Sequence, residues 1–335
     1  DAVVGRFAFA KVAVFAVLCQ GVVALHGGLQ SLRIDAAGLG DTQHLVPVVK
    51  GNGYGFGRPL LIEQATQFAT EIAVGTVFEA QDIPPSHTPI VLTPVGDELP
   101  VSLPSNAVLV VGSVQHVNTL VSHGWSGRVI IKLRSSVQRF GVAGADVASV
   151  VSAVSAAGFE QHGWSVHPPL DGTAANHMQE IAQWLSVVPN NLPMYVSHID
   201  ASTLNTLRTA HSQRKIVARS GTSLWLGDKS MLTLGTDVLD VSRINGGTAG
   251  YRNTPITGSG SLVVVGCGSS HGVAANAGDL SPFHFAQQRL TMLEPPHMHS
   301  TILFVQDGAT CPTVNDIVDV QQPLTRVQVD LLQWV

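Results

Sequence analysis

Short apolar runs recur along the chain from Leu45 onward, and the segments between them are mostly Ala-rich and compatible with helices. Each run is apolar on both faces, as expected for strands of a parallel sheet that helices cover. Strand and helix alternating about eight times predict an α/β fold built on a (β/α)8 TIM-type barrel. The predicted strands are LVPVVK, EIAVGT, PIVLTP, AVLVVG, RVIIKL, GWSVHP, PMYVSH and KIVARSG, and RPLLIEQATQFAT and ADVASVVSAVSAAG are two of the predicted helices.

The alternation stops near Asp237. The segments VLDVSRINGG, SLVVVG, STILFVQDG and DIVDVQQPL then indicate short strands separated by turns, which is typical of an antiparallel module. We therefore expect a barrel domain over residues 45–236 and a smaller β-rich domain over residues 237–335. Residues 1–44 are expected to pack on one of these two domains.

The stretch VAVFAVLCQGVVAL, residues 12–25, is apolar but too short to span a bilayer. Arg6 and Lys11 precede it, as in a signal peptide, yet no small-x-small cleavage site follows it cleanly. We therefore expect a buried first helix here.

Composition narrows the function classes. The 335 residues are 45% hydrophobic and 12% charged, which suits large buried cores. The net charge of -5 and the absence of Lys/Arg runs argue against nucleic acid as a partner. Three scattered cysteines, Cys19, Cys267 and Cys311, suggest neither a disulfide framework nor a Cys-rich metal site. We expect a cytoplasmic protein without a membrane partner.

The segment VVKGNGYGFG places Lys50 at the end of the first predicted barrel strand, where the chemistry of such barrels takes place. A partly desolvated lysine amine is a nucleophile toward carbonyls. The glycines that follow allow the backbone to approach a ligand, and Tyr54 offers a hydroxyl to a phosphate. A solvent-facing lysine in a glycine-rich loop fits the segment equally well. The glycine spacing matches neither a dinucleotide fingerprint nor a P-loop.

Five segments, in order and spacing, resemble motifs of the alanine racemase family, the fold-type III pyridoxal-phosphate enzymes. VPVVKGNGYGFG resembles the motif of the cofactor lysine, and IIKLRSSVQRFGV resembles a later strand with a lysine and an arginine seven positions apart. GWSVHPPLDG, IVARSGTSLWLGD and GGTAGYRNTPITG resemble three further motifs. The resemblance covers residues 45–335 and singles out Lys50, Tyr54, Lys132, Arg139, His167, Arg219, Gly221, Thr222 and Tyr251. Taken singly, each of these residues also fits an ordinary structural role.

The resemblance implies a PLP-dependent amino-acid racemase or epimerase that works as a homodimer with shared active sites. Lys50 would hold the cofactor and act as one base, and Tyr251 of the partner chain would be the other, since racemisation needs a proton removed on one face and delivered on the opposite face. Arg219 would face the pyridine nitrogen. The remaining implied roles are cofactor binding by Tyr54, His167, Gly221 and Thr222, substrate-carboxylate binding by Arg139, and support of Arg139 by Lys132, which is a carbamate in some members.

The sequence also departs from the family pattern. Ser197, in YVSHIDASTL, stands in for an Asn-Ser pair near the phosphate, and Cys267, in GCGSSHG, replaces a substrate-facing tyrosine. Thr301 or Ile302 occupies the place of a substrate-binding Met-Asp pair, and no tyrosine follows Val320. A substrate other than alanine, a decarboxylase of the same fold, and a non-catalytic cofactor-binding protein therefore stay open. His297 and His299 lie two residues apart, but without a third ligand they do not predict a metal site.

Overall fold

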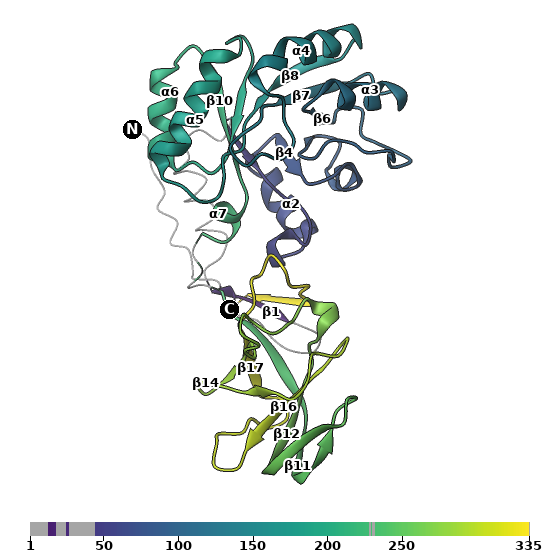
Figure 1. Ribbon diagram of the computed structural model, residues 1–335, viewed down its shortest axis with the longest axis vertical. Helices are drawn as coiled ribbons and strands as arrows, with labels where there is room; N and C mark the ends of the chain where they lie inside the picture. The colour runs from purple at the N-terminus through teal and green to yellow at the C-terminus, as the bar shows by residue number, and fades with distance from the viewer. Residues whose placement is uncertain (1–12, 18–24, 27–43, 228, 230–231, 335) are drawn as a thin grey trace, which may run out of the picture. The chain divides into compact units, whose positions relative to one another are not determined.

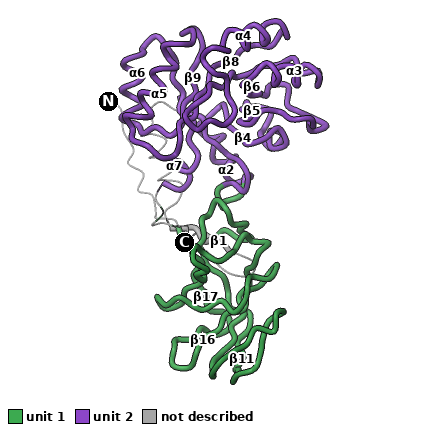
Figure 2. Tube along the Cα trace, in the orientation of Figure 1, with its two compact units in different colours: residues 1–32, 54–57, 228–335 green, residues 33–53, 58–227 purple. Residues whose placement is uncertain are grey.

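The chain divides into two compact units, drawn in different colours in Figure 2. The structure is a computed structural model that describes residues 13–17, 25–26, 44–227, 229 and 232–334 (Figure 1). The barrel unit contains the described residues of 33–53 and 58–227, and the β-rich unit contains those of 1–32, 54–57 and 228–335.

Eight parallel strands form the sheet of the barrel unit, in the order β3-β10-β9-β8-β7-β6-β5-β4. The barrel closes where the chain beyond β3 meets β4: Val48 bridges Ala73, and the amide of Val49 donates to the Ala73 carbonyl at 2.7 Å. The predicted (β/α)8 barrel is therefore confirmed, and each predicted run holds one strand. The strands are β3 (Leu45–Pro47), β4 (Glu71–Val74), β5 (Thr88–Val91), β6 (Val108–Val111), β7 (Arg128–Lys132), β8 (Glu160–Ser165), β9 (Met194–Val196) and β10 (Ile216–Ser220).

The barrel strands are rich in β-branched residues because both of their faces are buried. One set of side chains forms a cluster of its own, as the alternation of a strand requires. The cluster consists of Val46, Val48, Ala73, Ile90, Val108, Val110, Ile130, Tyr195 and Val217.

Helices follow most of the barrel strands, and polar side chains cap several of them. Asp200, for example, accepts a hydrogen bond from the amide of Thr203 at 2.7 Å and begins α6. The alternation is incomplete: a 3-10 helix, η3 (Val77–Asp82), joins β4 to β5, and residues 92–107 between β5 and β6 contain no helix. The α-helices are α2 (Arg58–Thr66), α3 (Val114–Ser122), α4 (Val147–Ala156), α5 (Ala174–Val187), α6 (Ala201–Ala210) and α7 (Thr222–Trp225).

The β-rich unit is built around a long hairpin of β11 and β12, and its sheet has ten strands within the described residues. The main path runs β14-β13-β17-β11-β12-β16-β15, and its pairs are antiparallel, as predicted. The predicted boundary at residue 237 falls inside β11. The strands are β1 (Ala13–Val17), β2 (Leu25–His26), β11 (Leu234–Ala249), β12 (Thr254–Val265), β13 (Phe283–Phe285), β14 (Gln288–Arg289), β15 (Thr291–Met292), β16 (Thr301–Gln306), β17 (Ile317–Val320) and β18 (Leu331–Trp334).

The expected first helix is wrong for the described part of residues 12–25. Ala13–Val17 forms strand β1, which pairs in parallel with β11 and antiparallel with β18. The segment AVFAV combines β-branched and aromatic residues that favour strands, and an apolar run without a period of 3.6 indicates burial rather than a helix. Residues 18–24 lie outside the described residues.

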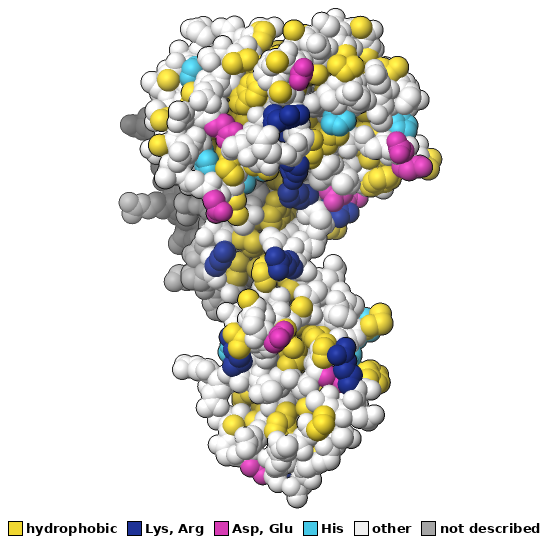
Figure 3. All heavy atoms as spheres, viewed as in Figure 1, with side chains coloured by type: hydrophobic (Ala, Val, Ile, Leu, Met, Phe, Trp, Pro, Cys, Tyr) yellow, Lys and Arg dark blue, Asp and Glu magenta, His cyan; other side chains and the backbone are white. Residues whose placement is uncertain are grey.

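On the face drawn in Figure 3, Lys and Arg side chains form separate small groups among polar and apolar atoms. This distribution agrees with the low charged fraction of the sequence. No helix among the described residues combines the length and the apolar character that a membrane span requires.

Candidate active site

Except for Tyr54, the residues predicted for the barrel site follow the carboxyl ends of the parallel strands. Lys50 follows β3, Lys132 ends β7, and Arg219 lies near the end of β10. In a parallel barrel these ends form one rim, so the topology brings together side chains that are distant in sequence. The same rim carries Arg139, His167, Ser197, Gly221 and Thr222, which follow the ends of β7, β8, β9 and β10.

Lys50 keeps access to solvent but has a perturbed amine. Partial burial lowers its pKa most, and the positive charges of Arg139 and Arg219 lower it further, while the carboxylate of Glu79 opposes them. Gly75, at the end of the neighbouring strand, leaves room for the lysine, because an added Cβ there would lie 3.3 Å from the Cβ of Lys50. The arrangement enriches the neutral amine, which is the nucleophilic form.

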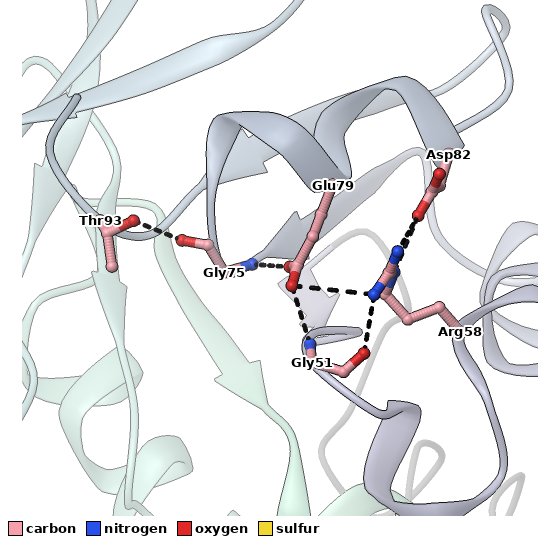
Figure 4. Close-up of polar contacts among 6 residues, drawn as sticks. All are labelled: Gly51, Arg58, Gly75, Glu79, Asp82 and Thr93. Carbon is pink, nitrogen blue, oxygen red and sulfur yellow. Dashed lines mark hydrogen bonds and ion pairs between the residues drawn. The ribbon is translucent and has the colours of Figure 1, made fainter. Parts of the chain in front are cut away.

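Glu79 was missed by the sequence reasoning, and it fixes the loop that carries Lys50 (Figure 4). Its carboxylate accepts from the amide of Gly51 at 3.0 Å and from the amide of Gly75 at 2.6 Å. Arg58 lies 3.9 Å from the same carboxylate, pairs with Asp82 at 2.8 Å and donates to the Gly51 carbonyl at 2.8 Å. The first residue after the lysine is therefore held from two sides.

The loop after β7 folds back on its own strand and returns Arg139 to the neighbourhood of Lys132. The amide of Val142 donates to the Lys132 carbonyl at 2.8 Å, and the amide of Arg134 donates to the Val142 carbonyl at 2.9 Å. Gly141 has a φ of 147°. A Cβ at that position would lie 2.8 Å from the backbone of Arg134, so the turn requires glycine.

The ring of Phe140 lies close to both Lys132 and Arg139. Its centroid is 5.3 Å from Nζ of Lys132 and 4.6 Å from Cζ of Arg139, and the charged guanidinium of Arg139 is within the range of cation–π attraction. Lys132 is buried, and this burial, followed by the charges of Arg219 and Arg139, lowers its pKa to about 6. At neutral pH the Lys132 amine is therefore mostly uncharged.

Arg219 is a buried cation of the site. Its Nη2 donates to the Val166 carbonyl at 3.0 Å, while its buried Nε finds no hydrogen-bond acceptor among the described residues. Burial lowers its pKa to about 10, and Tyr195 opposes this shift. The guanidinium thus stays charged at neutral pH, with a donor left over for a ligand.

His167 accompanies Arg219 as a neutral ring. Its Nδ1 makes a short hydrogen bond with the hydroxyl of Ser197, which is itself buried, and its ring lies 4.5 Å from that of His198 at a tilt of 52°. Burial, and then the charge of Arg219, lowers the pKa of His167 to about 2. The His167–Ser197 pair was not foreseen, although both residues were predicted for the site.

Gly221 and Thr222 form the turn from β10 into α7, with Gly221 as the N-cap and Thr222 as the first helical residue. The hydroxyls of Ser220 and Ser223 lie 2.9 Å apart across this turn. The turn therefore carries hydroxyls and backbone amides at the barrel rim, groups of the kind that bind phosphate.

Tyr54 belongs to the β-rich unit, although it follows Lys50 closely in sequence. It is buried and has a left-handed φ of 55°. The next residue, Gly55, abuts Leu324, since a Cβ on the glycine would lie 3.0 Å from that of the leucine. The expected contact of the Tyr54 hydroxyl with the cofactor phosphate stays a prediction.

Tyr251 lies in the turn between β11 and β12 and is 86% exposed. Tyrosine side chains are usually buried and hydrogen-bonded to the backbone, but Tyr251 is exposed. The proposed action of its hydroxyl on a partner chain's substrate stays a prediction.

The predicted substrate residues of the β-rich unit differ in accessibility. Cys267 and Thr301 have no exposed surface, Cys267 belongs to the core of the unit, and the Thr301 hydroxyl donates to the Cys267 carbonyl at 2.7 Å. Both side chains are closed off among the described residues, and their expected contact with a substrate stays a prediction. Ile302 is half-buried.

His297 and His299 have separate partners. Nε2 of His297 lies 2.5 Å from the carboxylate of Glu294, and Nδ1 of His299 lies 3.0 Å from the hydroxyl of Ser270. The pair therefore acts as two independent hydrogen-bonding groups in the structure.

The chemistry of the barrel rim suits an anionic ligand. The charges of Arg139 and Arg219 lower the pKa of both Lys50 and Lys132, and the carboxylate of Glu79 opposes them at Lys50. The buried Nε of Arg219 and the buried hydroxyl of Ser165 also lack partners among the described residues. Such groups are costly unless a ligand satisfies them.

Comparison with known proteins gives the fold of solved alanine racemases. The structure from Acinetobacter baumannii matches with a TM-score of 0.64 at 16% identity, over 95% of this chain and 92% of that one. The enzyme from Bartonella henselae, solved with covalently bound pyridoxal phosphate, matches with a TM-score of 0.65 at 16% identity, over 94% and 92%. The enzyme from Bacillus anthracis, with bound L-Ala-P, matches with a TM-score of 0.65 at 17% identity, over 94% and 86%.

At these identities structural similarity establishes a shared fold. A search among curated proteins finds no match. The family described as alanine racemase, N-terminal domain, matches residues 31–228, which is more than half of the chain. The chain therefore belongs to the alanine racemase family of fold-type III enzymes.

Proposed function

We propose that this protein is a PLP-dependent amino-acid racemase. One observation carries the proposal: Lys50 lies at the carboxyl rim of a barrel of this family, where partial burial and the charges of Arg139 and Arg219 lower its pKa. An amine with a depressed pKa is suited to hold an aldehyde cofactor and then to exchange protons. The covalent pyridoxal phosphate of the Bartonella henselae enzyme supports the choice of cofactor.

The barrel residues fit pyridoxal phosphate. Lys50 would hold it covalently, Nε of Arg219 would donate to its ring nitrogen, and the turn at Gly221 and Thr222 would bind its phosphate together with the Ser197 region. His167, neutral and fixed by Ser197, would pack on the ring. Bound pyridoxal phosphate supplies the electron sink that makes the α-hydrogen of an amino acid acidic. Arg219 stays protonated and so keeps its proton when it donates to the ring nitrogen, which limits side reactions.

The protein's own groups then handle the substrate and its proton. Arg139 would bind the substrate carboxylate, and Phe140 and Lys132 would fix the direction of its guanidinium. Because the Lys132 amine is mostly neutral at neutral pH, it adds little repulsion next to Arg139. It is also the form of lysine that reacts with carbon dioxide to give a carbamate. Nζ of Lys50 would remove or deliver the α-proton on one face.

Tyr251 would serve the opposite face of the substrate. Its exposure within its own unit means that its hydroxyl is available to another surface. We propose that this surface is the active site of a second copy of the chain, so that the enzyme works as a homodimer with shared sites. Because Cys267 and Thr301 are buried, they do not indicate which amino-acid side chain the substrate carries. Amino acids other than alanine therefore belong in the first substrate screen.

The first experiment is the visible absorption spectrum of the purified protein with pyridoxal phosphate, beside a Lys50→Ala variant. We expect a band of lysine-bound cofactor that the variant lacks. Single-enantiomer amino acids are then screened for loss of optical activity. Absence of the band from the wild-type protein would refute the proposal.

A further inference from the structure

The turn that carries Tyr251 is anchored from below by a buried carboxylate. Glu294 is 6% exposed and lies beyond β15. Its Oε1 accepts from the amide of Tyr251 at 2.9 Å, and its Oε2 accepts from the amide of Arg252 at 3.0 Å. One carboxylate therefore fixes two consecutive peptide groups of the turn.

The turn is shaped to admit this carboxylate. Gly250 has a φ of 80°, and a Cβ at that position would lie 2.3 Å from Oε1 of Glu294. Glycine is therefore required immediately before the tyrosine, both for the backbone conformation and for the close approach. Burial by itself would raise the pKa of Glu294, but hydrogen bonds from His297 and from the amides of Arg252 and Tyr251 outweigh it and lower the pKa. The anchor is thus an ionised carboxylate at neutral pH.

His297 joins the same carboxylate to the ring of Tyr251. Its Nε2 lies 2.5 Å from Oε1 of Glu294, which fixes the plane of the imidazole. The centroids of the imidazole and phenol rings lie 4.4 Å apart at a tilt of 42°. This contact limits the positions of an aromatic ring that is otherwise exposed.

We propose that Glu294 and His297 are positioning residues for Tyr251: Glu294 fixes the backbone of the turn, and His297 fixes the ring. This inference rests on the proposed function, in which the Tyr251 hydroxyl exchanges the α-proton on one face of the substrate. Neither residue touches the reacting atoms in this assignment. They act by holding the hydroxyl where the proton must be delivered, a placement in which an error of about 1 Å costs on the order of 100-fold in rate.

The placement of the ring is measured without any activity. The chain contains three tyrosines, so 3-fluorotyrosine labelling gives three 19F resonances, and Tyr251→Phe identifies the one from Tyr251. We expect His297→Ala and Glu294→Gln to move or broaden this resonance. The resonances of Tyr54 and Tyr195 report that the variants fold and should keep their shifts. An unchanged Tyr251 resonance in both variants would overturn the inference.

The functional test separates two reactions of the substrate in deuterated water. Racemisation requires both faces, whereas exchange of the α-hydrogen of one enantiomer requires Lys50 alone. We expect His297→Ala to lower the racemisation kcat by about 10- to 100-fold with an unchanged KM and with exchange of one enantiomer retained. His297→Gln, which keeps a donor toward Glu294 but lacks a ring to contact Tyr251, should recover only part of the rate. His299→Ala is the matched control and should behave as the wild type.

The outcomes distinguish the two proposals. If Tyr251→Phe loses racemisation while His297→Ala and Glu294→Gln keep the wild-type rate, the positioning role is refuted and the racemase proposal stands. If Tyr251→Phe itself racemises at the wild-type rate, the two-base proposal fails and the catalytic reading of the positioning role fails with it. Parallel loss of exchange and racemisation in His297→Ala would indicate general damage and overturn the positioning role.

Discussion

Nη2 of Arg219 donates to the carbonyl of Val166 at 3.0 Å, while Nε of the same guanidinium is buried without an acceptor among the described residues. Arg219 is therefore held by its own barrel and still presents one donor to a ligand. The positive charge of Arg219 also acts on residues to which it makes no hydrogen bond, because it lowers the pKa of Lys50, Lys132 and His167.

The charged residues around Lys50 predict that substitutions shift its pKa in opposite directions. Arg219→Met and Arg139→Met each remove a positive charge that lowers the Lys50 pKa, so the pKa should rise in both variants. Glu79→Gln removes the negative charge that opposes them, so the pKa should fall. Competitive acetylation of the cofactor-free protein over a pH series, with Lys50 followed by mass spectrometry, gives the midpoint. A shift of all three variants in one direction would contradict the charge assignment.

Lys132 predicts a dependence of stability on pH. Its folded pKa of about 6 lies below the ordinary value of 10.5, so between these values the unfolded chain binds more protons and stability rises with pH. Lys132→Met removes this penalty. The variant should therefore gain more stability over the wild type at pH 6.5 than at pH 9, with a limiting slope of about 1.4 kcal/mol per pH unit.

Urea unfolding of the cofactor-free protein at the two pH values tests the role of Lys132. The buffers are freed of carbon dioxide, because a neutral amine also reacts with it. Lys215→Met, at an exposed lysine, is the control and should give a difference that does not change with pH. An equal gain for Lys132→Met at both pH values would mean that the lysine is charged in the folded protein.

A hydrogen-bonded cluster of Glu71, His162 and Tyr195 stabilises the barrel. The hydroxyl of Tyr195 on β9 donates to the carboxylate of Glu71 at 3.0 Å, and Nε2 of His162 on β8 lies 2.7 Å from the same carboxylate. Tyr195→Phe should cost about 1.5–3 kcal/mol, the range for hydrogen bonds to charged groups. Tyr251→Phe, at an exposed position, should change stability by less than about 0.5 kcal/mol.

The cost of Tyr195→Phe should depend on pH. Burial raises the pKa of Glu71, but the hydrogen bond and charge of His162 and the hydrogen bond from Tyr195 outweigh it, and the pKa is lowered. A carboxylate with a lowered pKa contributes stability above its unfolded pKa and loses it as the pH falls through the folded value. The difference between wild type and variant, measured by urea unfolding, should therefore shrink in acid. A constant difference would show that Glu71 is not the charged partner.

Substitution of Gly141 should destabilise the protein and disturb the position of Arg139 in the candidate active site. At a φ of 147° and with Arg134 backbone 2.8 Å from an added Cβ, Gly141→Ala should cost about 1–3 kcal/mol and displace the loop that holds Arg139. Gly144→Ala is the matched control, because a Cβ there meets nothing within 4 Å. Thermal unfolding and substrate KM measure the two effects. Equal behaviour of the two variants would contradict the role of the turn.

The sequence was sufficient for the barrel because each parallel strand is marked by its own apolar run, and the end of the first run marked Lys50. Lys132 and Arg219 were singled out only by the resemblance to a known family. Glu79 and Phe140 carry no such mark, since their roles arise from contacts that only the folded chain creates. The apolar stretch at residues 12–25 does not by itself distinguish a helix from a strand, because it has no clear period.

The residues of the β-rich unit show a similar limit. Cys267 and Thr301 were assigned from the resemblance of motifs, which does not show whether a side chain is exposed: Thr301 begins β16, Cys267 follows β12, and both are buried. Glu294 and Tyr251 are 43 residues apart, and no local signal joins them.

The seam of the barrel bears on the order of folding. The segment that leads to Lys50 continues the first strand and pairs with the last: the amide of Val48 donates to the Ser220 carbonyl at 2.8 Å, and the Val48 carbonyl accepts from Trp225 at 2.7 Å. These partners are synthesised long after the lysine, and loops of this length close at an entropic cost that only the finished barrel offsets. A ribosome-bound chain that ends before β10 therefore contains Lys50 but lacks the hydrogen-bond partners that fix its segment. Binding of the proposed cofactor should begin only after the last strand has paired with the first.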